Sequence, residues 1–183
     1  MTTILVVFHT SEGETARIAD HVGAVLQELG DEVEVHDVAG APAPEHFDGA
    51  IVGDSGHAVH HSRALTRYVH DHVAVLNKLP AALFQVSLTA ANPDDEDEAT
   101  AQRLVQELLE RTDFDPDLVG LFAGAVVYTR YGWFKRRVVR AISRREGGDT
   151  DRSHDHEYTD WQAVEQFARD VHKLVQASAV ATS

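Results

Sequence analysis

Five consecutive apolar side chains, Ile4–Phe8, stand close to the start of this 183-residue chain. A run without alternating polar residues is typical of a strand that is buried on both faces, as in a parallel sheet covered by helices on each side. A short polar loop follows the run, and then apolar residues at helical spacing that end at Gly30. This order predicts the opening strand, loop and helix of an α/β domain.

Strand and helix patterns continue to alternate along the rest of the chain. The further strands are expected at 32–36, 49–53, 82–88 and 118–127, and the helices at 15–29, 62–76, around 104–109 and at 160–175. Because strands that alternate with helices are joined by right-handed crossovers, the sequence predicts a doubly wound sheet of five parallel strands. Residues 1–177 are expected to form one domain, with 178–183 as a frayed tail.

The loop after the first strand has the chemistry of a phosphate site. Its residues are Thr10, Ser11, Glu12, Gly13, Glu14 and Thr15. Three of them carry hydroxyl donors, and the first N–H groups of the following helix have no intrahelical partner. A triphosphate loop would carry the lysine of G-x-x-x-x-G-K-[ST], which is absent. Neutral donors suit the phosphate monoester of flavin mononucleotide; the alternative is a helix start that binds nothing.

Two other loops are expected beside this one. In a doubly wound sheet, ligands bind outside the carboxyl ends of the strands, and loops 53–60 and 87–92 follow predicted strands. The first of them begins with a turn expected at 54–57 and contains several histidines. The histidine spacings match no tetrahedral metal site, and the chain has no cysteine. The sequence therefore predicts no metal, and these histidines are expected to face solvent or a flavin.

The charge of the chain limits its partners and its compartment. Thirty acidic residues stand against sixteen basic ones, which gives a net charge of −14. Nucleic acid is not expected as a partner, because binding it needs a basic face. The acidic surface serves either general solubility or a high-salt habitat, where screening reduces self-repulsion. With no secretory pattern, no cysteine and no membrane-spanning run, a cytoplasmic location is expected, with peripheral contact at the inner face of the cell membrane as an option.

Positive charge is concentrated in a long insertion expected at 127–150, between the fifth strand and the last helix. Seven of the sixteen basic residues fall within it: Arg130, Lys135, Arg136, Arg137, Arg140, Arg144 and Arg145. A basic amphipathic helix with aromatic residues at its start suits an anionic membrane surface. It suits a carboxylated aromatic substrate equally well. The plain alternative is a surface helix whose arginines pair with nearby acids.

Together these features resemble the flavodoxin-like family and, within it, the quinone-dependent protoporphyrinogen oxidases. The resemblance runs from about Ile4 to Val175. Beyond the phosphate loop, it is carried by Ala123-Gly124-Ala125, Tyr128-x-Arg130-Tyr131-x-Trp133, Gly147-Gly148-Asp149-Thr150-Asp151 and Tyr158-Thr159-Asp160-Trp161.

The resemblance implies a noncovalent flavin mononucleotide whose phosphate lies in the loop from Thr10 to Thr15. Glu12 and Glu14 suit this role if their side chains point outward. The residues implied to flank the isoalloxazine ring are Asp54, Ser55, Gly56, His57 and Ala58 from one loop, and Ser87, Leu88, Thr89, Ala90 and Ala91 from the other.

The resemblance also implies an enzyme of haem biosynthesis that oxidises protoporphyrinogen and passes electrons to a membrane quinone of the menaquinone type. The candidates for contact with the substrate or the membrane are Tyr128, Arg130, Tyr131, Trp133, Arg136, Arg137 and Arg140. No catalytic base is assigned, and the oligomeric state stays open. Two other functions are retained: a flavodoxin-like electron carrier with another redox partner, and an interaction domain without cofactor.

Overall fold

The computed structural model describes residues 1–11, 13–56, 61–87, 95–122, 129–130 and 159–182. Its strands are β1 (Thr3–Phe8), β2 (Glu32–Asp37), β3 (Gly49–Gly56), β4 (Ala81–Ser87), β5 (Leu118–Phe122) and β6 (Thr129–Arg130). Its helices are α1 (Glu14–Glu28), α2 (Arg63–Leu76), α3 (Asp95–Thr112) and α4 (Trp161–Thr182), with short 3-10 turns η1 (Val38–Gly40) and η2 (Pro44–His46).

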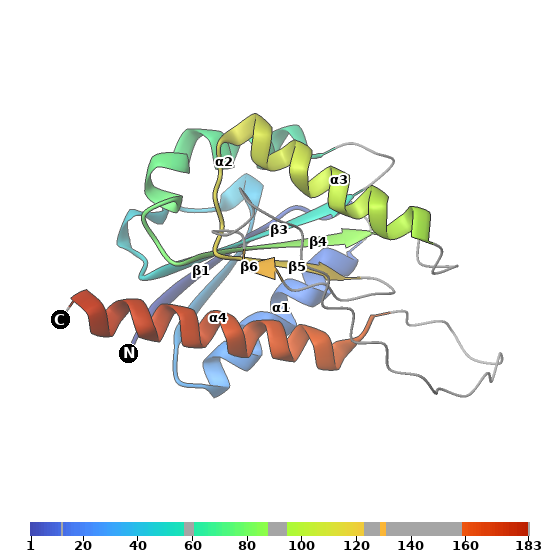
Figure 1. The fold of residues 1–183 in the computed structure, drawn as a ribbon. Helices are drawn as coiled ribbons and strands as arrows, with labels where there is room; N and C mark the ends of the chain where they lie inside the picture. Colours follow the sequence, from blue (N-terminus) through green and yellow to red (C-terminus); the bar gives the residue numbers. More distant parts are fainter. Residues whose placement is uncertain (12, 57–60, 88–94, 123–128, 131–158, 183) are drawn as a thin grey trace.

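One sheet lies between two layers of helices, with α1 and α4 on one face and α2 and α3 on the other (Figure 1). The strand order is β2-β1-β3-β4-β5-β6, and the first five strands are parallel. The doubly wound sheet of five parallel strands predicted from the sequence is therefore confirmed.

Alternate residues of β1 enter two separate cores, which explains its unbroken apolar run. Ile4, Val6 and Phe8 pack in the cluster that contains α1 and α4. Leu5 and Val7 pack in the cluster that contains α2 and α3. Because neither face of β1 meets water from Ile4 to Phe8, none of these five positions has a place for a polar side chain.

A sixth, two-residue strand was not predicted. β6 runs antiparallel to the start of β5, with Thr129 opposite Val119 and Arg130 opposite Leu118. It lies in the segment expected as an insertion, so the chain returns along the edge strand β5 before α4. The rest of the insertion, 131–150, lies outside the described residues.

Two predicted boundaries are wrong. The turn expected at 54–57 is in fact strand as far as Gly56, because the backbone from Asp54 to Gly56 continues in register with Gln85–Ser87 of β4. The tail expected to fray is helical as far as Thr182. Alternating alanines in this part of α4 explain the extension, since alanine has the highest intrinsic helix propensity.

Among the described residues, no helix is long and apolar enough to cross a membrane.

Gly53 in the central strand β3 has no room for a side chain, because a Cβ atom there would lie 2.2 Å from the ring of Phe84. Phe84 in turn packs against the rings of Phe122 and Phe167. We expect Gly53→Ala to lower the free energy of unfolding by about 1–3 kcal/mol through overpacking. Urea denaturation of Gly40→Ala is the control, since the space around Gly40 is open. Equal stability of the two variants would contradict this packing.

Candidate functional site

The loop between β1 and α1 has a defined turn. The backbone N–H of His9 donates to the carbonyl of Gly53 at 3.0 Å, which holds the start of the loop beside β3. Gly13 has a φ of 93°, in the left-handed region that favours glycine. The Gly13 N–H donates to Thr10 Oγ1 at 2.8 Å. The turn therefore depends on two of the residues that the sequence assigned to phosphate binding.

The start of α1 fits a phosphate monoester. Its first helical hydrogen bond is from Arg17 N–H to the Gly13 carbonyl at 3.1 Å, and no side chain caps the helix. The N–H groups of Glu14, Thr15 and Ala16 therefore have no intrahelical acceptor, and such groups bind anions. A Cβ atom at Gly13 would meet no heavy atom within 4 Å, so no described side chain crowds this residue of the turn.

The Glu14 carboxylate is engaged with groups outside the turn. One oxygen accepts from Arg17 Nη1 at 3.0 Å, and the other accepts from Thr159 Oγ1 at 2.5 Å. The negative charge of Glu14 is thus partly balanced by Arg17, which reduces its repulsion of a phosphate. Glu12 lies outside the described residues.

The same contacts join the start of α4 to the phosphate loop. The Arg17 guanidinium lies 5.5 Å from the centre of the Trp161 ring, and that ring stacks at a tilt on His21. The start of α4 is capped by Asp160, whose carboxylate accepts from the Ala163 N–H at 3.1 Å. The hydroxyl group of Thr159, the residue before this cap, donates to Glu14.

The residues predicted to flank a flavin ring begin at the ends of β3 and β4. Asp54 pairs with Gln85, Ser55 with Val86 and Gly56 with Ser87. The parallel register therefore brings Asp54, Ser55, Gly56 and Ser87 to one edge. The other predicted ring-flanking residues lie outside the described residues: His57, Ala58, Leu88, Thr89, Ala90 and Ala91.

Asp54 forms a buried pair with His61. Asp54 is 0% exposed and His61 is 9% exposed. His61 Nδ1 lies 2.5 Å from Asp54 Oδ2, and His61 Nε2 lies 2.7 Å from the carbonyl oxygen of Leu104 in α3. Oδ2 of Asp54 is thus bound to His61, and the hydrogen bond fixes the orientation of the carboxylate. Of the two expectations for the histidines near this loop, contact with solvent or contact with a flavin, the burial of His61 rules out the first for this residue.

Opposing influences act on the pKa of His61. Burial of the ring lowers it, whereas the hydrogen bond and charge of Asp54 raise it, helped by the Leu104 carbonyl. The charge of Arg111 in α3 opposes the rise, and the net result is a raised pKa of His61. The protonated ring is therefore favoured in the folded protein.

Gln85 was missed by the sequence reasoning. It is 0% exposed, and neither its amide nitrogen nor its amide oxygen has a hydrogen-bond partner among the described residues. Asp54, its neighbour on β3, likewise has one oxygen without a partner. A signal was present, because Gln85 interrupts the apolar run from Ala81 to Val86.

Residues 5–153 match the model of a family described as a flavodoxin domain. The chain belongs to the flavodoxin family. Protoporphyrinogen IX dehydrogenase (quinone) of Escherichia coli strain K12 is 33% identical over 172 residues, which are 93% of this chain and 94% of that protein. The protein of the same name from Leishmania major is 34% identical, over 91% of this chain and 73% of its own length. The family predicted from the sequence, that of these dehydrogenases, is confirmed.

Solved structures of other flavodoxins share the fold. Oxidised flavodoxin 1 from Bacillus cereus covers 94% of this chain and 98% of its own, with a TM-score of 0.55 and 18% identity. A flavodoxin mutant from Fusobacterium nucleatum, bound to flavin mononucleotide, covers 97% of this chain and 96% of its own, with a TM-score of 0.53 and 13% identity. At these identities the likeness shows the fold alone.

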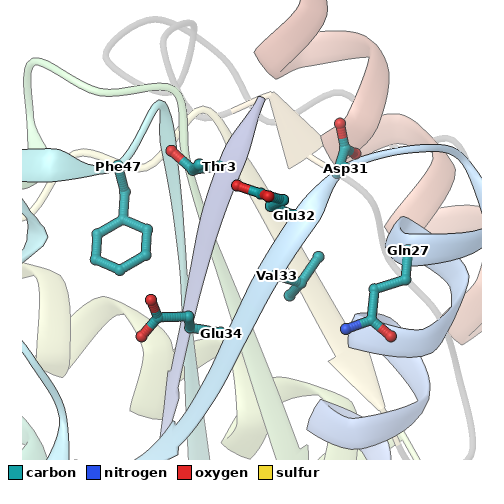
Figure 2. A pocket seen from close by; sticks show the side chains of 7 residues that line it. All are labelled: Thr3, Gln27, Asp31, Glu32, Val33, Glu34 and Phe47. Carbon is teal, nitrogen blue, oxygen red and sulfur yellow. The ribbon is translucent and has the colours of Figure 1, made fainter. Parts of the chain in front are cut away.

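This flavodoxin also has a groove of about 490 Å³ at the opposite, amino-terminal edge of its sheet (Figure 2). Its lining includes Asp31, Glu32 and Glu34 beside Phe47. Carboxylates repel a phosphate, so this groove does not fit the cofactor that the phosphate loop suits. The acidic groove and the phosphate loop are thus separated by the length of β1 and differ in charge.

The predicted substrate or membrane contacts are described only in part. Arg130 lies in β6. The others lie outside the described residues: Tyr128, Tyr131, Trp133, Arg136, Arg137 and Arg140. In the described part of the chain, no group of three histidine or acidic side chains is placed to hold a metal ion.

The raised pKa of His61 predicts a pH dependence of stability. The folded state keeps the proton above the ordinary pKa of about 6.5, whereas the unfolded state loses it there. The stabilisation is therefore complete below that value and is lost as the pH rises toward the raised pKa. Relative to Asp54→Asn/His61→Gln, we expect the wild type to lose stability as the pH rises above about 6.5, measured by urea denaturation. A constant difference across this range would contradict the assignment.

Proposed function

We propose that this chain is a flavin mononucleotide-dependent dehydrogenase that oxidises protoporphyrinogen IX and passes the electrons to a membrane quinone, as a step of haem biosynthesis. The observation that supports it most is the uncapped start of α1 behind Gly13, in a chain that is 33% identical to a protoporphyrinogen IX dehydrogenase (quinone) over nearly its whole length. The enzyme would work at the cytoplasmic face of the cell membrane.

The phosphate of the flavin would be held by the N–H groups of Glu14, Thr15 and Ala16, with hydroxyl groups of the loop beside them. The positive end of the α1 dipole adds to this attraction, and Arg17 offsets the charge of Glu14. When bound, the flavin supplies the redox chemistry. The ends of β3 and β4 would orient its ring, since their parallel register keeps Ser55–Gly56 beside Val86–Ser87.

The substrate carries carboxylates, and the net charge of −14 repels it from most of this surface. We propose that the basic residues of the 127–150 segment provide the exception. Arg130 is the described member of this group, and β6 keeps it at the edge of the sheet beside β5. The remaining arginines would bind either substrate propionates or anionic lipid headgroups.

The decisive experiment starts with the absorbance spectrum of the purified protein and a fluorescence titration with flavin mononucleotide. We expect a yellow protein that is reduced by anaerobic protoporphyrinogen and reoxidised by a menaquinone analogue. A bound flavin with a stable semiquinone but no reaction with protoporphyrinogen would instead identify an electron carrier. Protein that leaves flavin fluorescence unquenched would contradict both functions and favour an interaction domain.

Removal of two loop hydroxyls tests the phosphate site. We expect Thr10→Val together with Thr15→Val to weaken flavin binding by about 2–4 kcal/mol, because phosphate oxygens lose donors. Thr10→Val also removes the acceptor for the Gly13 N–H. The matched control is Thr66→Val on α2, whose hydroxyl donates within its own helix to Ser62. Equal affinities of the control and the double variant would place the phosphate elsewhere.

Neutralising the basic segment tests its role at the membrane. We expect Arg136→Gln/Arg137→Gln/Arg140→Gln to release the protein from anionic vesicles in a sedimentation assay, with flavin content unchanged, because each lost arginine removes about 1 kcal/mol of attraction. The matched control removes the same charge from exposed positions on α2 and α3, by Arg63→Gln/Arg67→Gln/Arg103→Gln. Equal vesicle binding by both triple variants would remove the membrane role from this segment.

A further inference from the structure

Asp54, His61 and Gln85 form a buried polar cluster on the α2–α3 side of the sheet. Asp54 and Gln85 are paired residues of adjacent strands and are both 0% exposed, so their side chains stand on the same face. The apolar core formed by β3, β4, α2 and α3 surrounds them. An ionisable pair in such surroundings is costly unless its charges balance, so its presence calls for a role.

The hydrogen bonds of His61 determine how many protons the pair holds. A carbonyl oxygen accepts and cannot donate, so Nε2, which lies 2.7 Å from the Leu104 oxygen, must carry a hydrogen. One further proton then lies between His61 Nδ1 and Asp54 Oδ2, which are 2.5 Å apart. With that proton the pair has no net charge, whether the proton belongs to the ring or to the carboxyl group. Without it, a single negative charge is buried.

The pair is placed where it can act on the flavin site. Asp54 directly follows Gly53, whose carbonyl accepts from His9 at the start of the phosphate loop. It directly precedes Ser55 and Gly56, which are expected beside the ring. Through His61 and the Leu104 carbonyl, this end of β3 is tied to α3. Movement of Asp54 would therefore displace both the support of the phosphate loop and the approach to the ring.

We propose that Asp54 and His61 are positioning residues for the flavin, which hold the carboxyl end of β3 in its binding geometry as long as the pair shares one proton. This inference rests on the proposed function. Among the described residues, the groups that face the pair are Gln85 from β4, the Leu104 carbonyl from α3 and, at longer range, the Arg111 cation from α3. The neighbouring side chains of α2, Leu65 and Val69, are apolar.

Charge balance predicts opposite pH trends for two single variants. In His61→Gln the Asp54 carboxylate has no counter-charge, so flavin affinity should fall about tenfold or more as the pH rises. In Asp54→Asn the ring can stay neutral, so affinity should fall only as the pH drops and the ring gains a proton. The double variant Asp54→Asn/His61→Gln is neutral at both positions and should show neither of these two trends. Fluorescence titration with flavin mononucleotide measures all three.

A second carboxylate–histidine pair provides the matched control. At the opposite edge of the sheet, Asp31 accepts from His172 Nδ1 at 2.7 Å, and also from Gln176 and Thr2. We expect His172→Gln to lower the free energy of unfolding, measured in urea. Flavin affinity should stay within about twofold of the wild type, because residues at opposite edges of the sheet with no shared partners do not couple strongly. Equal effects of His61→Gln and His172→Gln on affinity would overturn the positioning role.

The remaining outcomes are also distinguishable. A wild type that binds flavin, together with single variants that lack opposite pH trends, overturns this inference and leaves the proposed function intact. A wild type that binds no flavin overturns the proposed function and this inference together. If His61→Gln does not fold, Asp54→Asn and the double variant still test the inference. Asp54→Asn must bind flavin more weakly at low pH, and the double variant must not show this weakening.

Discussion

Burial of β1 on both faces is the constraint from which the rest of the structure follows. Helices α1 and α4 cover one face and α2 and α3 the other, so every residue from Ile4 to Phe8 is apolar and buried. A strand in this position has parallel neighbours on both sides, here β2 and β3. Parallel neighbours place the carboxyl ends of β1, β3 and β4 at one edge, and this edge carries the loop between β1 and α1, the described residues that are predicted to flank a flavin ring, and the Asp54–His61 pair.

The two edges of the sheet differ in charge for a physical reason. At the carboxyl edge, α1 begins without a side-chain cap and presents N–H groups, while Arg17 offsets the charge of Glu14. At the amino edge, Asp31, Glu32 and Glu34 line the groove (Figure 2). In a chain with a net charge of −14, an anion is therefore attracted by local backbone dipoles rather than by the overall field. This arrangement favours a bound phosphate over a freely diffusing polyanion.

A carboxylate–histidine pair lies at each edge of the sheet; Asp54–His61 is buried, and Asp31–His172 is partly buried. Asp31 links the turn after α1 to α4 through His172, and Asp54 links β3 to α3 through His61. The Asp31 carboxylate has three partners, whereas one oxygen of Asp54 has none among the described residues. The Asp54–His61 pair is therefore more sensitive to its proton, because fewer hydrogen bonds share the cost of a charge there.

Most of the architecture was determined by the sequence alone, because it depends on local patterns. The run Ile4–Phe8 and the alternating strand and helix patterns after it predict a doubly wound sheet, and the glycine and hydroxyls before α1 predict an anion site. Only the tertiary structure decided what depends on contacts between distant segments. Asp54–Gly56 is strand because it pairs with β4. The antiparallel strand β6 forms along the free edge of β5. Strand register and helix packing bring Asp54, His61 and Gln85 together. A polar side chain has the same appearance in a sequence whether it faces water or a buried partner, and packing alone distinguishes the two.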